Sequence, residues 1–303
     1  MQSLYHSTIV LPAAQIFFRM RKMLTRMVDS DYSACIPPLL LLFHARSATV
    51  QQSADCTGFD AKIAVRDLTK MYGDLVVLDK INFSIKRGEL VSIVGPTGCG
   101  KTTFLNCMSK LTETTSGNIY IDGEVANPRK HNLAFVFQEP TALPWLTVSE
   151  NVGYGMRIKK MPKPEMEKRL NFILDLVGLK DTANLYPNQV SASMMQRIAV
   201  ARAFAVNPDL LLMDEPYGQL DVKLRFYLED ELVKLWQTLK STVLFVTHNI
   251  EEAVYVADRI LVLSPKPTKV RAEVVVDLPR PRDFRDPKFI ELRRQVTDLI
   301  RWW

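Results

Sequence analysis

The sequence predicts an α/β fold in which a mostly parallel sheet carries a helical insertion. Predominantly apolar runs at residues 90–94, 209–215 and 242–247 are typical of buried strands. Segments with apolar residues three and four positions apart follow these runs, as expected for helices. A long helical stretch from about residue 144 to 205 separates the first two runs and predicts the insertion.

The region before residue 90 predicts an antiparallel β subdomain. Its segments alternate between apolar and polar residues, which is typical of half-buried strands, and glycine-containing pairs separate them as turns. A strand and turn after the first helix belong to the same pattern. These strands and turns are expected at residues 62–72, 73–74, 78–85, 87–88 and 117–123, and a further strand at 132–138.

The later elements are expected in the order helix, strand, helix, strand. Within the helical insertion, Thr147 and Glu150 have the spacing of a capping box and predict the start of a helix. The elements after the insertion and the strand at 209–215 are expected at residues 222–239, 242–247, 250–257 and 259–263.

A glycine-rich segment, GPTGCGKTT, follows the apolar run at residues 90–94 and precedes an expected helix at 104–111. Strand, glycine-rich turn and helix form the context that a phosphate-binding loop requires. Glycines let successive N–H groups point into one concavity, and the helix N-terminus adds partial positive charge. A turn with a chance lysine is the alternative, which the flanking elements disfavour. The chain is therefore predicted to bind a nucleoside triphosphate through Gly95, Pro96, Thr97, Gly98, Cys99, Gly100, Lys101, Thr102 and Thr103.

Two carboxylates, Asp214 and Glu215, end the apolar run at residues 209–215. Ligands in open α/β sheets bind at the carboxyl edge of the strands. We expect Lys101 to reach the β- and γ-phosphates, and Thr102 and Asp214 to hold Mg²⁺. Glu215 would orient or deprotonate the attacking water. The alternative, a strand that ends in two solvated acids, is weakened by the phosphate-binding loop.

Two further polar residues follow apolar strands. Gln138 ends one strand and is a candidate contact of the metal ion or the water. His248 follows the strand at 242–247 and is a candidate hydrogen-bond donor to the γ-phosphate, although a histidine in this place is also consistent with a purely structural role.

Composition limits the function classes. The chain has 303 residues, 47% of them hydrophobic, enough for one large domain or two small ones. Its formal net charge of +6 is spread widely, with no concentrated basic stripe, so no nucleic acid is expected as a partner. The four cysteines form no disulfide framework and suit a reducing compartment. No apolar run approaches the ~20 residues of a membrane span, so membrane association is expected through a partner.

The two ends differ from the centre. Residues 1–58 are expected to be a disordered leader or translated sequence upstream of the true start, with an organelle-targeting or membrane-surface helix as the alternative. Residues 59–277 form the predicted nucleotide-binding domain, with a helical subdomain at about 142–205. Residues 278–303 are expected to form an amphipathic extension that packs on its own domain. Its apolar side carries Phe289, Leu292, Val296 and Leu299, and Trp302 and Trp303 at its end are an alternative contact for a partner.

From about residue 62 to 277 the chain resembles the ATPase subunit of an ABC transporter. The matching segments, in order, are GPTGCGKTT, FVFQEPTALPWLTVSENV, VSASMMQRIAVARAF, LLLMDEPYGQLD and LFVTHNIEEAVYVADRILVLSP. The resemblance implies a P-loop NTPase core with an antiparallel β subdomain and a helical signature subdomain. It also implies that Asp214 and Glu215 are the metal-binding and catalytic acids.

The resemblance assigns further roles by position. Tyr72 lies where an aromatic ring stacks on adenine, with a core tyrosine as the alternative. Gln138 matches the glutamine loop, Asp221 the aspartate loop that couples two facing sites, and His248 the switch histidine. Subunits of this family pair head to tail around two ATP molecules, and the signature segment of the opposite subunit, here represented by Ser191, completes each site.

The segments TALPWLTVSENV and PRPRD more narrowly resemble the importer group for nitrate, sulfonates and taurine. Residues 143–145 then lie where such subunits receive the coupling helix of the membrane protein. Trp145 is expected either as an exposed anchor of that contact or as part of the domain's own core.

The signature departs from the family pattern. Ser191 is retained, whereas Ala192 and Ser193 stand where the family has two glycines. A Cβ at these positions blocks the close approach of the backbone to the γ-phosphate or disfavours the required dihedral angles. Two outcomes are expected: a weaker site in this subunit, or pairing with a different ATPase subunit in which only one of two sites is fully active.

The sequence thus predicts an ATP- and Mg²⁺-dependent ATPase that powers solute import, peripheral to the cytoplasmic face of the plasma membrane. Its expected partners are a second ABC ATPase subunit, a transmembrane permease and, indirectly, a solute-binding protein for a small anion or sulfonate-type solute. The alternative is a regulatory or weakly hydrolysing paralogue in a heterodimer. A third class, soluble ABC proteins of ribosomes or DNA repair, is disfavoured because the chain has one nucleotide domain and no coiled-coil insertion.

Overall fold

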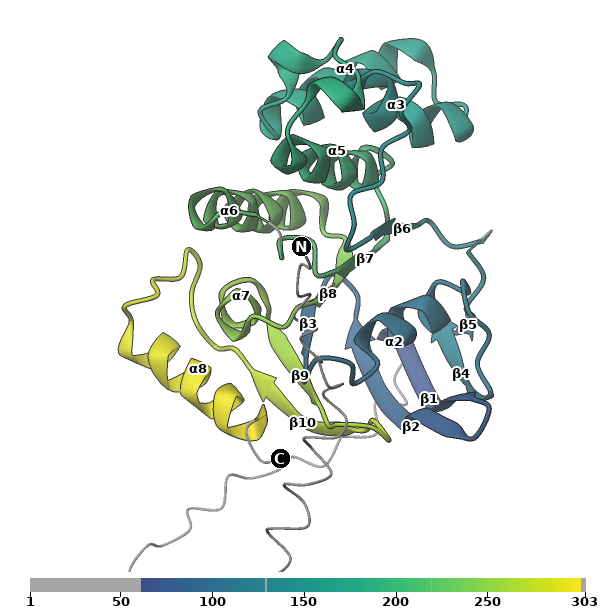
Figure 1. The fold of residues 1–303 in the computed structure, drawn as a ribbon, viewed down its shortest axis with the longest axis vertical. Coiled ribbons are helices and arrows are strands. Elements are labelled where there is room, and N and C mark those ends of the chain that lie inside the picture. Colours follow the sequence, from purple (N-terminus) through teal and green to yellow (C-terminus); the bar gives the residue numbers. More distant parts are fainter. Residues whose placement is uncertain (1–60, 129, 219, 301–303) are drawn as a thin grey trace, which may run out of the picture. The chain divides into compact units, whose positions relative to one another are not determined.

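The computed structural model describes residues 61–128, 130–218 and 220–300. The leader predicted for residues 1–58 and the terminal pair Trp302 and Trp303 lie outside the described residues. Within the described part, the chain forms two sheets and a set of helices around them (Figure 1). None of the described helices combines the length and the apolar character that crossing a membrane requires.

One sheet is antiparallel and corresponds to the predicted β subdomain. Its strand order is β2-β1-β4-β5, with β1 at Ala61–Tyr72, β2 at Leu75–Lys86, β4 at Ser116–Ile121 and β5 at Glu124–Val125. In β1, buried apolar residues alternate with more exposed ones, as a one-sided sheet requires. The two-residue strand β5 was not predicted from the sequence.

The second sheet is mostly parallel and has the strand order β10-β9-β3-β8-β7-β6. All neighbouring pairs are parallel except β9 and β10. Every residue of β3, β7 and β8 is buried, which explains their continuous apolar runs. The strands are β3 Leu90–Val94, β6 Leu133–Val136, β7 Leu210–Asp214, β8 Thr242–Val246, β9 Arg259–Leu263 and β10 Val270–Val275, of which β10 was not predicted.

The helical insertion contains three α-helices that pack on one another: α3 at Val148–Ile158, α4 at Lys163–Leu176 and α5 at Ala192–Ala205. The predicted capping box is present at α3, where the Thr147 hydroxyl accepts from the Glu150 N–H and the Glu150 carboxylate accepts from the Thr147 N–H. The remaining α-helices are α2 Lys101–Met108, α6 Val222–Leu239, α7 Ile250–Val256 and α8 Pro287–Ile300.

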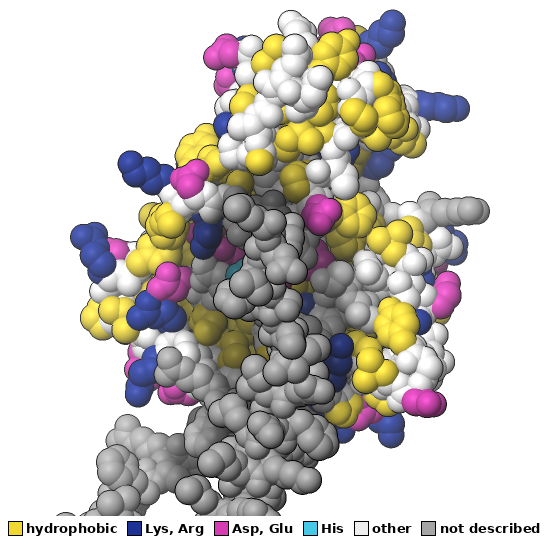
Figure 2. All heavy atoms as spheres, viewed as in Figure 1, with side chains coloured by type: hydrophobic (Ala, Val, Ile, Leu, Met, Phe, Trp, Pro, Cys, Tyr) yellow, Lys and Arg dark blue, Asp and Glu magenta, His cyan; other side chains and the backbone are white. Residues whose placement is uncertain are grey.

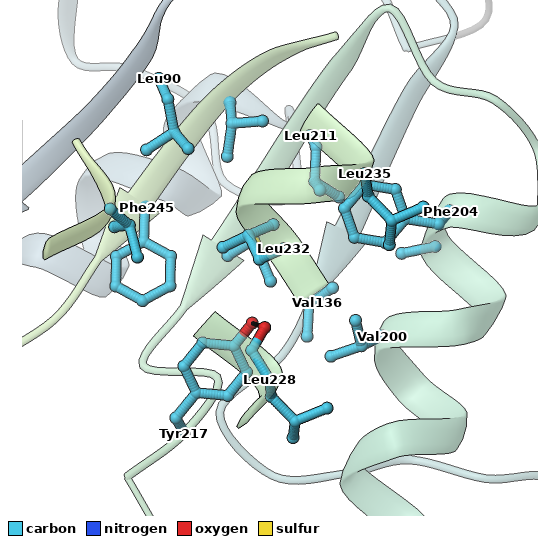
Figure 3. Close-up of a cluster of buried hydrophobic side chains, with 14 of the residues drawn as sticks. Leu90, Val136, Val200, Phe204, Leu211, Tyr217, Leu228, Leu232, Leu235 and Phe245 are labelled. Atoms are coloured by element: carbon cyan, nitrogen blue, oxygen red, sulfur yellow. Dashed lines mark hydrogen bonds between the residues drawn. The ribbon is translucent and has the colours of Figure 1, made fainter. Parts of the chain in front are cut away.

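Apolar packing joins these helices to the parallel sheet. Figure 3 shows residues of α5 and α6, including Phe204 and Leu232, in one buried cluster with residues of the strands, including Leu211 and Phe245. The amphipathic C-terminal helix α8 buries Phe289 and Val296 in the same cluster. The core therefore fixes the parallel strands, and with them the loops at their carboxyl ends.

Candidate nucleotide and catalytic site

The strand order brings the predicted site residues to one edge of the parallel sheet. In the order β3-β8-β7-β6, the carboxyl ends lead to the phosphate-binding loop, to His248, to Asp214 and Glu215, and to Gln138. Because parallel strands end at the same edge, four segments far apart in the sequence become neighbours. The site is thus assembled by the topology of the sheet.

The loop after β3 has the backbone geometry that glycine permits. Gly98 and Gly100 have φ values of +76° and +108°, a region that side-chain-bearing residues rarely adopt. A Cβ on Gly100 would also lie 2.9 Å from Cγ1 of Val77. Gly95 is required for lack of space, because a Cβ there would lie 3.1 Å from the carbonyl oxygen of Leu263.

Helix α2 begins at Lys101, earlier than the predicted start at residue 104. No side chain caps its N-terminus, and its first turn carries no acidic residue. The free N–H groups therefore remain available to an anion. The Lys101 side chain is 6% exposed, and its ammonium group donates to the carbonyl oxygens of Gly95 at 3.1 Å and Pro96 at 3.2 Å.

Three predicted site residues converge on the carboxylate of Glu215. His248 Nδ1 lies 2.8 Å from its Oε2, and Gln138 Nε2 donates to the same oxygen at 3.4 Å. Lys101 Nζ lies 3.8 Å from Oε1. Glu215 itself has a φ of 45°, and its N–H donates to the carbonyl oxygen of Val246 at 2.8 Å. A non-glycine residue held in this left-handed region is a strain typical of functional sites.

The Asp214 side chain fits the role of a cation ligand. It is 3% exposed, and its Oδ1 atom has no hydrogen-bond partner among the described residues. Burial, with a contribution from the Glu215 charge, raises the pKa of Asp214, whereas a hydrogen bond with Thr102 opposes the rise. A buried carboxylate oxygen without a partner is the group that a bound cation would compensate.

Mg²⁺ suits this set of donors better than a cation that needs a closed protein cage. No cluster of three or more His, Cys, Asp or Glu side chains able to hold a metal is found in the described part of the chain. Mg²⁺ prefers one or two protein oxygen ligands together with substrate phosphates and water. Thr102, Asp214 and Gln138 offer such oxygens, so the residues present fit the ion.

A cleft of about 650 Å³ opens over the loop. Tyr72 lines it and is 50% exposed, so the alternative of a core tyrosine is wrong. Among the loop residues, Gly95, Pro96 and Cys99 are not part of the lining, and Cys99 is buried in the core beneath the β subdomain. The lining residues are Tyr72, Leu75, Val77, Thr97, Gly98, Gly100, Lys101, Thr102, Thr103, Gln138, Glu215, His248 and Lys266.

Sequence reasoning missed the segment between β9 and β10. The Thr268 side chain is fully buried and donates a hydrogen bond to the carbonyl oxygen of Cys99, and the Thr268 N–H donates to Val77. These bonds join the phosphate-binding loop to the β subdomain, and Lys266 from the same segment lines the cleft. The proline-rich run around these residues was the available signal, because it marks a tight loop at the end of a strand.

Three further predicted residues lie outside the lining of this cleft. Ser191 is not part of the lining and instead caps α5, accepting a hydrogen bond from the Met194 N–H at 3.3 Å. Trp145 is 69% exposed, so the alternative that places it in the domain's own core is wrong. Asp221 caps α6 through a bond from the Leu224 N–H at 3.1 Å.

Fold and site together define a P-loop nucleoside triphosphatase. Residues 78–218 match the family model described as ABC transporter. An uncharacterized ABC transporter ATP-binding protein of Methanocaldococcus jannaschii is 39% identical over 244 residues, which cover 79% of this chain and 91% of the relative. The chain belongs to the ATP-binding subunits of the ABC transporter family, as the resemblance of its motifs predicted, and it is an ATPase of that family.

Two relatives with assigned transport roles are similarly close. An aliphatic sulfonates import ATP-binding protein of Bacillus cereus is 38% identical over 234 residues, covering 77% of this chain and 92% of the relative. A nitrate import ATP-binding protein of Synechocystis is 34% identical over 252 residues, covering 79% and 95%. Among solved structures, a dimeric ATP-binding cassette in a post-hydrolysis state with ADP and Pi matches with a TM-score of 0.65 and 35% identity, covering 72% of this chain and 100% of the other.

Proposed function

We propose that this chain powers solute import by hydrolysing ATP at the cytoplasmic face of the plasma membrane, in complex with a separate ABC permease. The observation that carries the proposal is the convergence of Lys101, Gln138 and His248 on Glu215 at the mouth of the phosphate-binding loop. The names of the sulfonate and nitrate relatives support an importer and favour a small anion or a sulfonate-type solute.

In the proposed reaction, Glu215 orients the attacking water and accepts its proton, since it is the carboxylate that faces the cleft. Lys101 and His248 stabilise the charge that develops on the transferred phosphoryl group. Thr102, Asp214 and Gln138 would hold Mg²⁺, which neutralises charge on the β- and γ-phosphates when it is bound. Tyr72 offers its exposed ring to the adenine.

A second subunit is needed to complete each site. Ser191 lies outside the cleft of its own chain, at the N-terminus of the 14-residue helix α5. A helix N-terminus attracts phosphate, so Ser191 and α5 are suited to the γ-phosphate of an ATP bound to a facing subunit. The dimeric cassette with ADP and Pi, to which this chain is similar, supports such a pairing. The partner is either a second copy of this chain or another ABC ATPase subunit.

The permease contact is proposed at the segment between Gln138 and α3. The amide side chain of Asn151, fully buried in α3, accepts from the Leu143 N–H at 2.7 Å and donates to the Leu143 carbonyl at 3.1 Å. This anchoring leaves Trp145 projecting into solvent at 69% exposure. Figure 2 shows hydrophobic side chains gathered on the part of the described surface that α3 and α4 occupy. The segment therefore links an exposed aromatic anchor to Gln138, which contacts the catalytic carboxylate.

We expect Trp145→Ala to reduce recovery of the permease. In a pull-down from membranes of the native host, the parent chain should recover a multi-spanning membrane protein. The variant should recover about tenfold less of it, because an exposed aromatic anchor contributes roughly 1–2 kcal/mol or more to an interface. Tyr227→Ala, which removes a 44% exposed aromatic from α6, outside the proposed contact, is the matched control. Recovery of ribosomes or DNA by the parent chain instead would contradict the importer proposal.

A specific observation favours the weakly hydrolysing alternative. The hydroxyl groups of Ser191 and Ser193 lie 2.9 Å apart and hydrogen-bond to each other. Ser193 thus adds a side chain where the family has glycine. Its hydroxyl also hydrogen-bonds to the Ser191 hydroxyl, the group that would face the γ-phosphate. Both effects oppose a close approach of the facing nucleotide.

We therefore expect Ser193→Gly to raise steady-state ATP turnover by roughly fivefold, the equivalent of about 1 kcal/mol of relieved backbone and side-chain conflict. Phosphate release by the purified protein measures the effect. Ser193→Ala, which removes the bond to Ser191 but keeps the Cβ, separates the two causes. If neither variant exceeds the parent turnover, the substituted signature does not limit this subunit.

A further inference from the structure

The residues on both sides of His248 are bound to one buried carboxylate. The Thr247 hydroxyl donates to Oε2 of Glu252 at 2.5 Å, and Nδ2 of Asn249 donates to Oε1 of Glu252 at 3.3 Å. The Asn249 N–H also donates to the Thr247 hydroxyl at 3.0 Å. We call this set, Thr247, Asn249 and Glu252, the histidine clamp. It closes the turn in which His248 lies.

The clamp is fixed to helix α7. Glu252 lies in the first turn of α7 and is 4% exposed, whereas Thr247, which follows β8, is 1% exposed. The Asn249 side chain caps the same helix, since its Oδ1 accepts from the N–H groups of Glu251 and Glu252 at 2.9 and 3.5 Å. Hydrogen bonds to α7 therefore hold the turn on both sides of His248.

Helix α6 supplies the charge that balances the clamp. Arg225 Nε lies 3.4 Å from Oε1 of Glu252. A second buried carboxyl, Glu229, approaches from the same helix. Burial, with a smaller contribution from Glu252, raises the pKa of Glu229 to about 8, so this group is mostly neutral at pH 7. Burial raises the pKa of Glu252 as well, and the hydrogen bond from Thr247 and the Arg225 charge oppose that rise.

The imidazole of His248 is held by fewer contacts than the backbone on either side of it. Its side chain is 56% exposed, and the bond to Glu215 is the one side-chain hydrogen bond recorded for it among the described residues. Packing does not fix an exposed ring, so the backbone on either side sets its direction. A displacement of about 1 Å at a catalytic group can cost orders of magnitude in rate.

We propose that Glu252, acting through Thr247 and Asn249, is a positioning residue that holds His248 against Glu215 during ATP hydrolysis. The inference rests on the proposed catalytic roles of Glu215 and His248. It adds to them a buried group that lies outside the lining of the cleft. The chemical consequence is that loss of the clamp lowers turnover and leaves nucleotide binding intact.

Thr247→Val tests the proposal, because valine keeps the shape of the side chain and removes the hydroxyl. We expect ATP turnover to fall about tenfold, with the KM for ATP changed by less than about twofold. Thr247→Ser, which restores the hydroxyl, should recover most of the turnover. In a His248→Ala background, Thr247→Val should lower turnover by no more than about a further twofold, because residues that act through one another are not additive.

A second variant keeps the test independent of folding. If Thr247→Val melts below the assay temperature, Asn249→Ser retains an N-cap oxygen for α7 but loses the amide donor to Glu252. It should lower turnover in the same way and lose this effect in the His248→Ala background. Parent-like turnover in both variants would overturn the proposal. An equal fall with and without His248 would overturn it too. Parent-like turnover of His248→Ala itself would instead refute the catalytic role of the histidine, and the proposal with it.

Discussion

Glu215→Gln should reduce steady-state ATP turnover by about 10²- to 10⁴-fold, the range that a positioned general base supplies. Glutamine has nearly the same size and can keep contacts with His248 and Gln138, but its amide cannot accept a proton from water. The substitution also removes the negative charge 3.8 Å from Lys101, so nucleotide affinity should be retained or increased. Phosphate release and nucleotide titration measure the two effects.

The same variant should trap the closed dimer. We expect hydrolysis to reopen the dimer, so a subunit that binds ATP without cleaving it should elute as a dimer with ATP and Mg²⁺, as judged by light scattering. Glu291→Gln, on the exposed side of α8, is a charge-matched control that should behave like the parent. Hydrolysis by Glu215→Gln at the parent rate would show that another group activates the water.

Ser191→Arg should abolish turnover to a similar degree without weakening the first binding of nucleotide. Ser191 lies outside its own cleft, so a single subunit should bind ATP as tightly as the parent. In the dimer, the bulk of an arginine side chain at the N-terminus of α5 should keep the facing γ-phosphate away from the helix N–H groups, and loss of one such contact costs about 10²-fold or more. Asn171→Arg on the exposed face of α4 adds the same charge to the same subdomain as a control. Unchanged turnover in Ser191→Arg would show that the signature segment does not take part in the active site.

Most of the fold could be predicted because its central strands are buried on both faces. The runs that form β3, β7 and β8 are short, continuous and predominantly apolar, which is typical of strands buried on both faces. The exposed two-residue strand β5 has no such signal. Strand β10 follows a proline-rich loop and has mostly half-buried or exposed residues, so its pairing with β9 depends on tertiary contacts. Helix α2 starts inside a glycine-rich motif that has no helical periodicity.

Candidate site residues could be named from the sequence, but the way they lie relative to one another could not. Position in the motifs pointed to Glu215 and His248, whereas their 2.8 Å contact arises because β7 and β8 are neighbours in the sheet. The bond between Thr268 and Cys99 joins residues 169 positions apart, a separation at which the sequence carries no periodic signal. The histidine clamp is local, and the sequence could have indicated it, because Asn249 precedes two glutamates at the second and third positions after it, a pattern typical of a helix start.

The central claim is that each active site combines the Glu215 half of one subunit with the Ser191 half of another. It is tested most directly by mixing Glu215→Gln with Ser191→Arg and measuring phosphate release. Each variant alone should be nearly inactive. An equimolar mixture of homodimerising subunits should recover about a quarter of the parent turnover, because half of the dimers then carry one site with both halves intact. Ser191→Arg that hydrolyses ATP alone at the parent rate would contradict the claim, and so would a mixture that dimerises yet stays inactive.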